Sequence, residues 1–368
     1  MAASWWLYGQ DLALAQELQH RAITTSQQRD LLLANISILS YLGDYDGCAH
    51  WLDQVGGRRD VIGRQSDYRL RRFRRLPNPW RALIEAERED SLCATIDSKL
   101  QDGLPVVVDL VGGIGDQLEN AALLLNIQTQ LSRIPTLYVR TLGENAGIVT
   151  RLLEQVEGLN LLSQANQDHA QWRITAPWFR YWLGRCGIRE TIRRPLLDEA
   201  RVDGSGRGTL LVCWRTKPDA MTPLSSFSRS LPFARIASLL DQWRGAAQRR
   251  GLQLIDISDY TPDEARVLQT SHGGWVTLAR QQLNSLQDTL RLMRQAEAIA
   301  TVDTSLGHLA VLCRRQVNLL LPLWPDERWY DLLADGLYRE LTTVHRQTRF
   351  HSWEEPLDAL SRELQLTR

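Results

Sequence analysis

The sequence predicts an α/β protein: two Rossmann-type, doubly wound parallel domains that follow a small all-α region. Apolar residues in the first hundred positions recur at helical spacing. From residue 105 onward, short buried strands alternate with helices in two separate runs. A glycine-rich segment, residues 203–208, lies between the runs and is expected to be an interdomain hinge. The strand ends of two such sheets are expected to face each other across a cleft, where ligands of these folds bind.

Residues 1–100 are expected to form the helical region. The apolar stripe between Leu31 and Leu42 predicts one helix, and a second follows from Tyr45 to about Val55. The run from Leu42 to Leu52 resembles the turn and second helix of a tetratricopeptide repeat. Because one repeat cannot bury its own face, a structural cap is favoured over a partner-docking array. The arginines crowded between residues 58 and 75 predict a solvated helix face rather than a membrane or acceptor surface.

Composition excludes several functions. The 368 residues include 43 basic and 43 acidic side chains, so the formal net charge is zero, which argues against a nucleic-acid partner. The five cysteines lie far apart, without a C-x-x-C pair or zinc-ligand spacing, and are expected to be small buried side chains of a reducing compartment with no metal. Neither a signal peptide nor an apolar stretch of eighteen residues is present, so a cytoplasmic location is expected.

The first α/β run is assigned to a domain of residues 101–203. Its expected strands are 106–110 and 136–140, and its expected helices are 116–132 and 145–156. The loop from Gly112 to Gln117 joins the first strand to its helix. Leu118 stands where a dinucleotide fingerprint has another glycine, which disfavours a nicotinamide or flavin site. On the residues alone, Asp116 is expected to cap the helix, and catalysis is the alternative.

The second run is assigned to a domain of residues 204–353. Its expected strands are 209–214, 252–257, 298–302 and 317–321, and its expected helices are 232–250, 285–297 and 305–314. A C-terminal segment, residues 354–368, contains one more helix. The sequence leaves open whether that helix stays with this domain or crosses back to the first.

The most informative stretch is the strand 298–302, which leads into Asp303, Thr304 and Ser305 and then into a helix carrying His308. A helix entered in this way presents unpaired backbone N–H groups, hydroxyls and an imidazole. We therefore predict a seat for the pyrophosphate of a nucleotide sugar. A structural loop role is favoured for Asp303 over a ligand role, whereas a buried role and a ligand role are equally weighted for His308.

Three residues follow the last strand of this predicted site. Trp324 and Trp329 offer rings that could stack on a nucleotide base, and Arg328 lies between them. Core packing is the favoured role for each tryptophan taken alone.

These motifs resemble the heptosyltransferase-like glycosyltransferases of GT-B fold, in particular the branch with a preceding tetratricopeptide region. The resemblance rests on the G-x-G-D loop from Gly113 to Asp116 and on the stretch from Asp288 to Pro322, with its Asp-Thr-(x3)-His-Leu-Ala pattern. A weaker match begins at Leu211. The resemblance covers about residues 104–345. It departs from the family after the His-Leu-Ala pattern, where this chain has Val311 to Arg315 instead of Gly-Ala-Leu-Gly.

The resemblance implies a role for each matched residue. Asp116 would be the general base that deprotonates the acceptor hydroxyl. Gly113, Gly115 and Gln117 are expected either to meet the acceptor or to form this loop. The residues expected to bind the donor are Arg215, Lys217, Arg229, Asp303, Thr304, Ser305 and His308. The arginines and Lys217 would neutralise the leaving nucleoside diphosphate in place of a metal, and the nucleotide sugar would be a co-substrate with no further cofactor.

The predicted activity is transfer of a sugar from a nucleotide-sugar donor to a hydroxyl of a glycan, a lipid-linked glycan or a protein. Two alternatives stay open. One is a nucleotide-sugar-binding protein without turnover that docks a protein partner through its helical region. The other is an epimerase or hydrolase of a nucleotide sugar.

Overall fold

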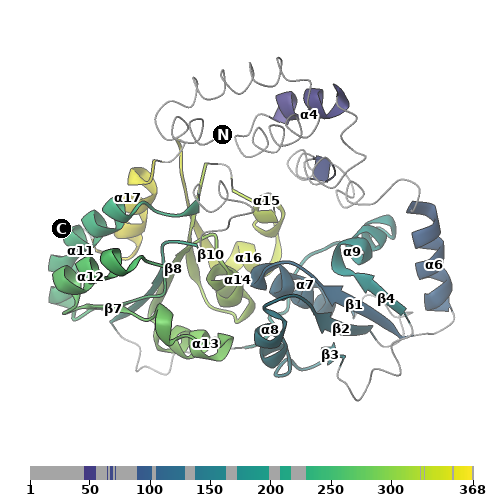
Figure 1. The fold of residues 1–368 in the computed structure, drawn as a ribbon, viewed down its shortest axis with the longest axis horizontal. Helices are drawn as coiled ribbons and strands as arrows, with labels where there is room; N and C mark the ends of the chain where they lie inside the picture. Colours follow the sequence, from purple (N-terminus) through teal and green to yellow (C-terminus); the bar gives the residue numbers. More distant parts are fainter. Residues whose placement is uncertain are drawn as a thin grey trace.

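A computed structural model describes residues 45–54, 64, 67–68, 71, 89–101, 105–128, 137–162, 172–198, 208–216, 229–323, 325–326, 328–349 and 352–366. Two parallel sheets lie side by side in this part of the chain (Figure 1). One has four strands in the order β3-β2-β1-β4, and the other has six in the order β10-β9-β8-β5-β6-β7. The prediction of two parallel α/β units is confirmed. We call residues 105–198 the first lobe and residues 208–366 the second lobe.

The first lobe builds its sheet around β1, all five residues of which are buried. The strands are β1 (Val106–Leu110), β2 (Leu137–Thr141), β3 (Asn160–Leu161) and β4 (Trp172–Thr175), and the helices are α7 (Ile114–Ile127), α8 (Ala146–Leu153) and α9 (Ala176–Arg185). A strand buried on both faces needs apolar residues at every position, which is why β1 reads as a continuous apolar run broken only by Asp109. Before this lobe comes α6 (Glu89–Gln101), whose Asp97 accepts a 2.9 Å hydrogen bond from the Trp182 indole.

The second lobe repeats the plan on a larger sheet. Its strands are β5 (Thr209–Cys213), β6 (Gln253–Asp256), β7 (Val276–Leu278), β8 (Ala298–Val302), β9 (Val317–Leu321) and β10 (Thr342–Arg346). Its helices are α11 (Phe233–Arg250), α12 (Pro262–His272), α13 (Leu286–Gln295), α14 (Ser305–Leu312), α15 (Arg328–Leu332) and α16 (Gly336–Leu341), with the 3-10 turn η6 (Arg280–Gln282). All pairings in both sheets are parallel, so the strand ends that carry the candidate site residues share one edge of each sheet.

The last helix, α17 (Glu354–Glu363), lies on the second lobe. Its apolar face, with Leu357 and Leu360, joins the cluster of buried side chains around Trp243 of α11. The Trp243 indole N–H donates a 2.8 Å hydrogen bond to the Ser361 hydroxyl. Of the two paths that the sequence left open, the structure shows the one in which this helix stays with the second lobe.

In the N-terminal region, α4 (Tyr45–Gln54) confirms the second predicted helix. The stripe from Leu31 to Leu42, most of the arginine-rich stretch and residues 203–207 of the expected hinge lie outside the described residues. The tetratricopeptide resemblance therefore stays a prediction. Among the helices that the structure describes, none has the length and apolar character needed to cross a bilayer.

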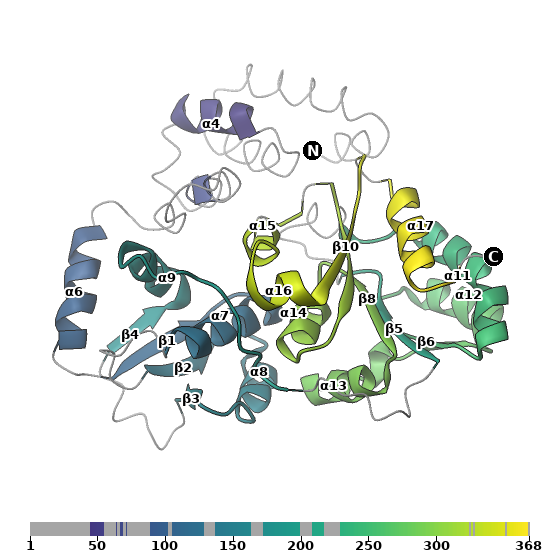
Figure 2. The same ribbon diagram turned by 180° about the vertical axis from the view of Figure 1, so that it is seen from behind.

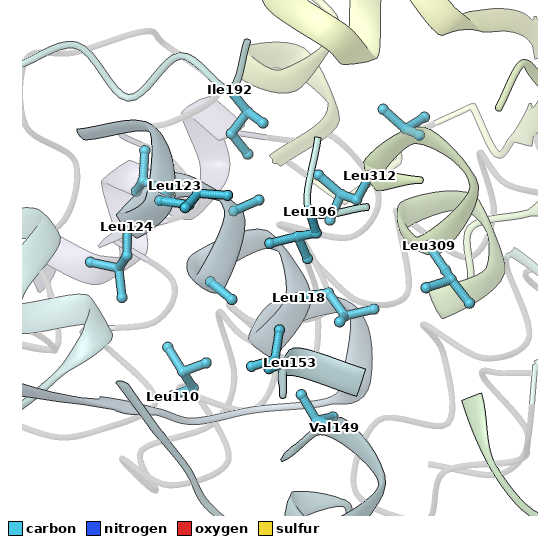
Figure 3. Close-up of a cluster of buried hydrophobic side chains, with 14 of the residues drawn as sticks. Leu110, Leu118, Leu123, Leu124, Val149, Leu153, Ile192, Leu196, Leu309 and Leu312 are labelled. Carbon is cyan, nitrogen blue, oxygen red and sulfur yellow. The ribbon is translucent and has the colours of Figure 1, made fainter. Parts of the chain in front are cut away.

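One apolar core serves both lobes. Helices α7 and α14 pack against each other between the two sheets, as both views of the molecule show (Figures 1 and 2). In Figure 3, Leu118 and Leu196 of the first lobe lie in the same cluster as Leu309 and Leu312 of the second. Apolar surface buried in this way stabilises by roughly 25 cal/mol per Å². Separating the lobes would expose that core to water.

A strap of the chain, residues 188–198, fastens the lobes through its backbone. The amides of Leu196 and Leu197 donate to the carbonyl of Leu312 at 2.8 and 3.2 Å, and the amide of Leu337 donates to the carbonyl of Ile192 at 2.9 Å. The two bonds to Leu312 cap the carboxyl end of α14, whose last carbonyls have no partner within the helix. The lobes are thus joined in their described parts by main-chain hydrogen bonds as well as by a core.

Candidate functional site

The first part of the site is the turn between β1 and α7. Gly112 has a φ of +98°, a conformation that favours glycine, and Gly113 is the N-cap of α7. Asp116, at the third helical position, accepts a 2.9 Å hydrogen bond from the backbone N–H of Gly113 through Oδ2. The predicted capping role of Asp116 is therefore confirmed, and its other oxygen, Oδ1, is directed to the second lobe.

An ion pair across the lobes holds that second oxygen. Arg328, the first residue of α15, places Nη1 2.5 Å from Asp116 Oδ1. The same guanidinium donates from Nε and Nη2 to the two oxygens of Asp326, at 2.8 and 3.0 Å. The side chains of Arg328 and Asp116 are 19% and 37% exposed, so both can be reached from solvent. Sequence reasoning noted Arg328 only for its position after the last strand of the predicted site.

The second part of the site is the start of α14. Thr304 is its N-cap, and the Thr304 hydroxyl lies 3.3 Å from the amide of Leu306 and 2.8 Å from the hydroxyl of Thr301. Thr304 and Ser305 are half-buried, whereas Asp303 is 5% exposed. Strand β8, buried along most of its length, fixes this turn at the strand end. The geometry is that of a helix start with two half-buried hydroxyl residues, of which Thr304 already caps the helix.

His308 lies one turn further along α14 and is only 2% exposed. Its ring stacks on Trp329 at 4.8 Å between centroids, and Nδ1 lies 2.8 Å from the hydroxyl of Tyr338. A Cβ on Gly115 of the first lobe would lie 2.8 Å from the ring edge. Burial, and then the nearby Arg328, lower the pKa of His308 and favour the neutral ring. Of the two roles that the sequence weighted equally for His308, the structure shows the buried one, because the ring packs between the lobes.

The same contact changes the interpretation of two neighbours. Gly115 leaves room for the His308 ring rather than for a ligand. Trp329 packs, as favoured from the sequence, and does not present its face to a base.

Gln117 has the loop role of the two that were expected. It is fully buried, and its side-chain amide donates to the carbonyls of Gly112 and Leu142 at 3.1 and 2.9 Å. It therefore supports the turn instead of meeting the acceptor. Gly113 is exposed beside Asp116 and keeps its predicted place in the acceptor-side loop.

The predicted cations differ in their surroundings. Arg215 pairs with Glu264 at 2.7 Å and lies over the ring of Tyr260. Arg229 lies 3.4 Å from the carbonyl of Asp303 and 3.8 Å from its carboxylate, and its Nε is buried without a hydrogen-bond partner. Arg229 is thus the guanidinium placed beside the turn before α14. Lys217 lies outside the described residues.

Behind Asp116 lies a buried charge network that sequence reasoning missed. Arg180 of α9 donates a hydrogen bond from Nη1 to Glu119 Oε1, at 2.8 Å. Its Nε donates a second hydrogen bond, also at 2.8 Å, to Glu190 Oε2. Glu119 follows Asp116 by one helical turn, so both carboxylates lie on one face of α7. A charge in the middle of a helix, one turn after the Asp of the loop, was the available signal. The network ties α7 to α9 and fixes the helix that carries Asp116.

Two buried groups near the ends of β5 and β6 are structural. Asp256 accepts hydrogen bonds from the amide of Ser258 and the hydroxyl of Tyr260, at 2.8 and 2.7 Å, and burial raises its pKa to about 6. Burial also raises the pKa of Cys213 to about 12, which leaves the thiol unreactive at neutral pH. All five cysteines are free; four are buried as predicted, whereas Cys186 is exposed, which corrects the prediction for that residue. Within the part of the chain that the structure describes, no cluster of His, Cys, Asp and Glu side chains is suited to hold a metal ion.

Comparisons with known proteins give matches among solved structures alone. Neither a protein-family model nor a curated protein sequence matches the chain. Among solved structures, the chain is similar to the E. coli heptosyltransferase WaaC with ADP, at 11% identity and a TM-score of 0.47, over 71% of this chain and 99% of that one. It is similar to the E. coli ADP-heptose lps heptosyltransferase II at 14% identity and a TM-score of 0.48, over 72% and 98%. It is also similar to a glycosyl transferase family 9 protein from Veillonella parvula at 10% identity and a TM-score of 0.46, over 72% and 97%.

Proposed function

We propose that this protein is a glycosyltransferase that moves a sugar from a nucleotide-sugar donor to an acceptor hydroxyl. One observation carries the proposal: the Asp116 carboxylate of the first lobe and the N-terminus of α14 in the second lobe, a helix end suited to bind phosphate, lie at the same interface between the lobes. Gly115, next to Asp116, touches His308, and His308 lies one turn from Thr304. The two predicted halves of the chemistry are therefore neighbours.

The donor's diphosphate is proposed to bind at the start of α14. Amides in the first helical turn and the hydroxyls of Thr304 and Ser305 suit an anion, and the helix dipole adds to them. Arg229 supplies positive charge beside the turn. These groups would stabilise the negative charge that develops on the leaving diphosphate without a bound metal.

The transfer itself needs one proton acceptor. The acceptor's O–H proton passes to the Asp116 carboxylate while its oxygen forms a bond to the anomeric carbon. The bond from that carbon to the diphosphate oxygen breaks, and its electron pair leaves with the diphosphate. General-base catalysis of this kind contributes about 10²- to 10⁴-fold to the rate.

The test is a thermal-shift and transfer assay with UDP-, GDP-, ADP-, CDP- and dTDP-linked sugars. We expect one base to stabilise the protein by an amount that grows with the logarithm of its concentration over Kd. Asp116→Asn should bind the donor at least as tightly as the wild type and reduce transfer by about 10²-fold or more, and EDTA should leave transfer unchanged. Full turnover in the Asp116→Asn variant would exclude Asp116 as the general base. Donor binding that is unaffected by Arg229→Met would exclude the proposed diphosphate site at the start of α14.

One observation favours a second function, a nucleotide-sugar-binding protein without turnover. Both Asp116 oxygens are engaged, one by the Gly113 amide and one by Arg328. A donor that binds but yields neither transfer nor hydrolysis with a mixed set of acceptors would support this alternative.

A further inference from the structure

Arg328 is aimed at Asp116 by a second carboxylate. Asp326 accepts two side-chain bonds from the Arg328 guanidinium and a third, at 3.1 Å, from the Arg328 backbone amide. This leaves Nη1 as the nitrogen that reaches the first lobe. The planar guanidinium can make such a fork, whereas a lysine ammonium cannot. The direction of Arg328 is therefore built into the turn before α15.

The ion pair cannot be parted by a simple opening of the lobes. The strap and the shared core also join the lobes, through Leu196, Leu312 and their neighbours. A change at the pair has to be local, in the side chains of Arg328 and Asp116.

A ligand anion at the start of α14 would lie close to this guanidinium. Trp329, the residue after Arg328, stacks on His308 of α14, and the charge of Arg328 lowers the pKa of that histidine. Arg–phosphate pairs are strong and geometrically specific, so a diphosphate competes well with a half-exposed carboxylate for Arg328.

We propose that Arg328 is a positioning residue that exchanges partners when the donor binds. With the second lobe empty, it holds Asp116; with a diphosphate at the start of α14, it turns to the diphosphate and frees Asp116 Oδ1 for the acceptor hydroxyl. This inference rests on the proposed function and deepens it. It makes donor binding a precondition for a working base, so the donor binds before the acceptor.

The test is a double-mutant cycle on the binding of inorganic pyrophosphate. Isothermal titration calorimetry at fixed pH and salt measures the affinity of each variant. Asp116→Asn removes the competitor and is expected to tighten binding three- to tenfold. Arg328→Met is expected to weaken binding at least tenfold. In the Arg328→Met background, Asp116→Asn should change the affinity less than twofold, because there is no guanidinium left to release.

Matched controls come from another ion pair between the lobes, Arg193 with Asp335 at 2.9 Å, where both side chains are largely exposed. Arg193→Met and Asp335→Asn should leave pyrophosphate affinity unchanged. If Arg328→Met lowers the melting temperature below the assay range, Arg328→Gln takes its place in the cycle.

The outcomes separate the inference from the proposed function. If Asp116→Asn tightens binding equally in both backgrounds, the gain is only relief of charge repulsion and the exchange is overturned. If pyrophosphate binds and Arg328→Met has no effect, the exchange is again overturned while the seat stands. If the wild-type protein does not bind pyrophosphate, both the seat and the exchange fail.

Discussion

At the scale of single residues, the contact between Gly115 and His308 decides what the G-x-G-D loop does here. From sequence, glycine in that loop indicates close approach of a ligand to the backbone. The structure fills the space with a histidine ring that is stacked on one side and hydrogen-bonded on the other. A ring held on both sides cannot shift cheaply, so the position tolerates no Cβ.

Gly115→Ala is expected to lower the free energy of unfolding by about 1–3 kcal/mol, because the overlap with His308 outweighs the gain in helix propensity. Gly147→Ala is the matched control, since Gly147 is also helical and a Cβ there meets nothing within 4 Å. The control should be neutral or stabilising by up to about 1 kcal/mol. Urea unfolding of both variants checks this, and equal behaviour of the two would contradict the contact.

The site could be predicted only as far as local patterns reach. The cap formed by Asp116 and the hydroxyls at the start of α14 follow from residues within a few positions of one another. The partner of Asp116 lies 212 residues away in Arg328, and the partner of His308 lies 30 residues away in Tyr338. Pairings of this kind depend on how the lobes pack, for which no spacing rule exists.

At the scale of elements, the central strands were predicted almost to the residue. The strands 106–110, 298–302 and 317–321 are found as β1, β8 and β9 with the expected bounds, because strands buried on both faces are continuous apolar runs. Strand β10 was missed: it lies at the edge of its sheet, where Thr343, Val344 and Arg346 are exposed and the apolar run is lost. Helix α12 was missed as well, because it carries few apolar residues, although Thr261 and Glu264 form a capping box.

The strap depends on one side chain of α7. Asn126 accepts from the amides of Arg193 and Arg194, at 2.8 and 2.6 Å, and donates to the carbonyl of Arg194 at 2.9 Å. Asn126→Ala should lower the free energy of unfolding by about 1–3 kcal/mol, because several backbone groups lose their partner. Hydrogen exchange at Leu196 and Leu197 should accelerate with it.

Gln155→Ala is the control for that variant, since Gln155 donates only to the carbonyl of Arg151 on the same exposed surface. It should change stability by less than about 0.5 kcal/mol. If hydrogen exchange at the Leu196 amide is unchanged in Asn126→Ala, the strap does not depend on the Asn126 side chain.

At the scale of the whole molecule, the shared core predicts that both lobes unfold together. A hinge between two independent domains, as the sequence suggested, would give two transitions. With Leu118 and Leu309 in one cluster, we expect a single one. Native-state hydrogen exchange should give β1 and β5 the same opening free energy. A difference beyond about 2 kcal/mol between them would show that the lobes are independent units.

The dependence of stability on pH follows from four buried groups. Burial lowers the pKa of His272, His308 and His345, so below about pH 6.5 the unfolded chain binds more protons than the native one. Their contribution to stability is present above about pH 6.5 and is lost as the pH falls. Asp256 acts in the opposite sense: its native pKa of about 6 lies above the ordinary 3.8, so stability is gained as the pH falls through that window.

Urea unfolding between pH 7.5 and 5 measures the balance. His308→Gln should reduce the loss below about pH 6.5 by up to about 1.4 kcal/mol per pH unit, the share of one proton. Asp256→Asn should make the loss steeper. An unchanged slope in His308→Gln would mean that this ring is not held neutral by its surroundings.

The union of the lobes through the strap and the common core has a consequence for how the chain can be handled. A protease site introduced within residues 199–207 would sever the covalent link while leaving intact the hydrogen bond between Leu196 of the upstream piece and Leu312 of the downstream piece. The two fragments should then co-purify as a nicked heterodimer, and pieces expressed separately should complement each other, so that each half can be isotope-labelled alone for spectroscopy.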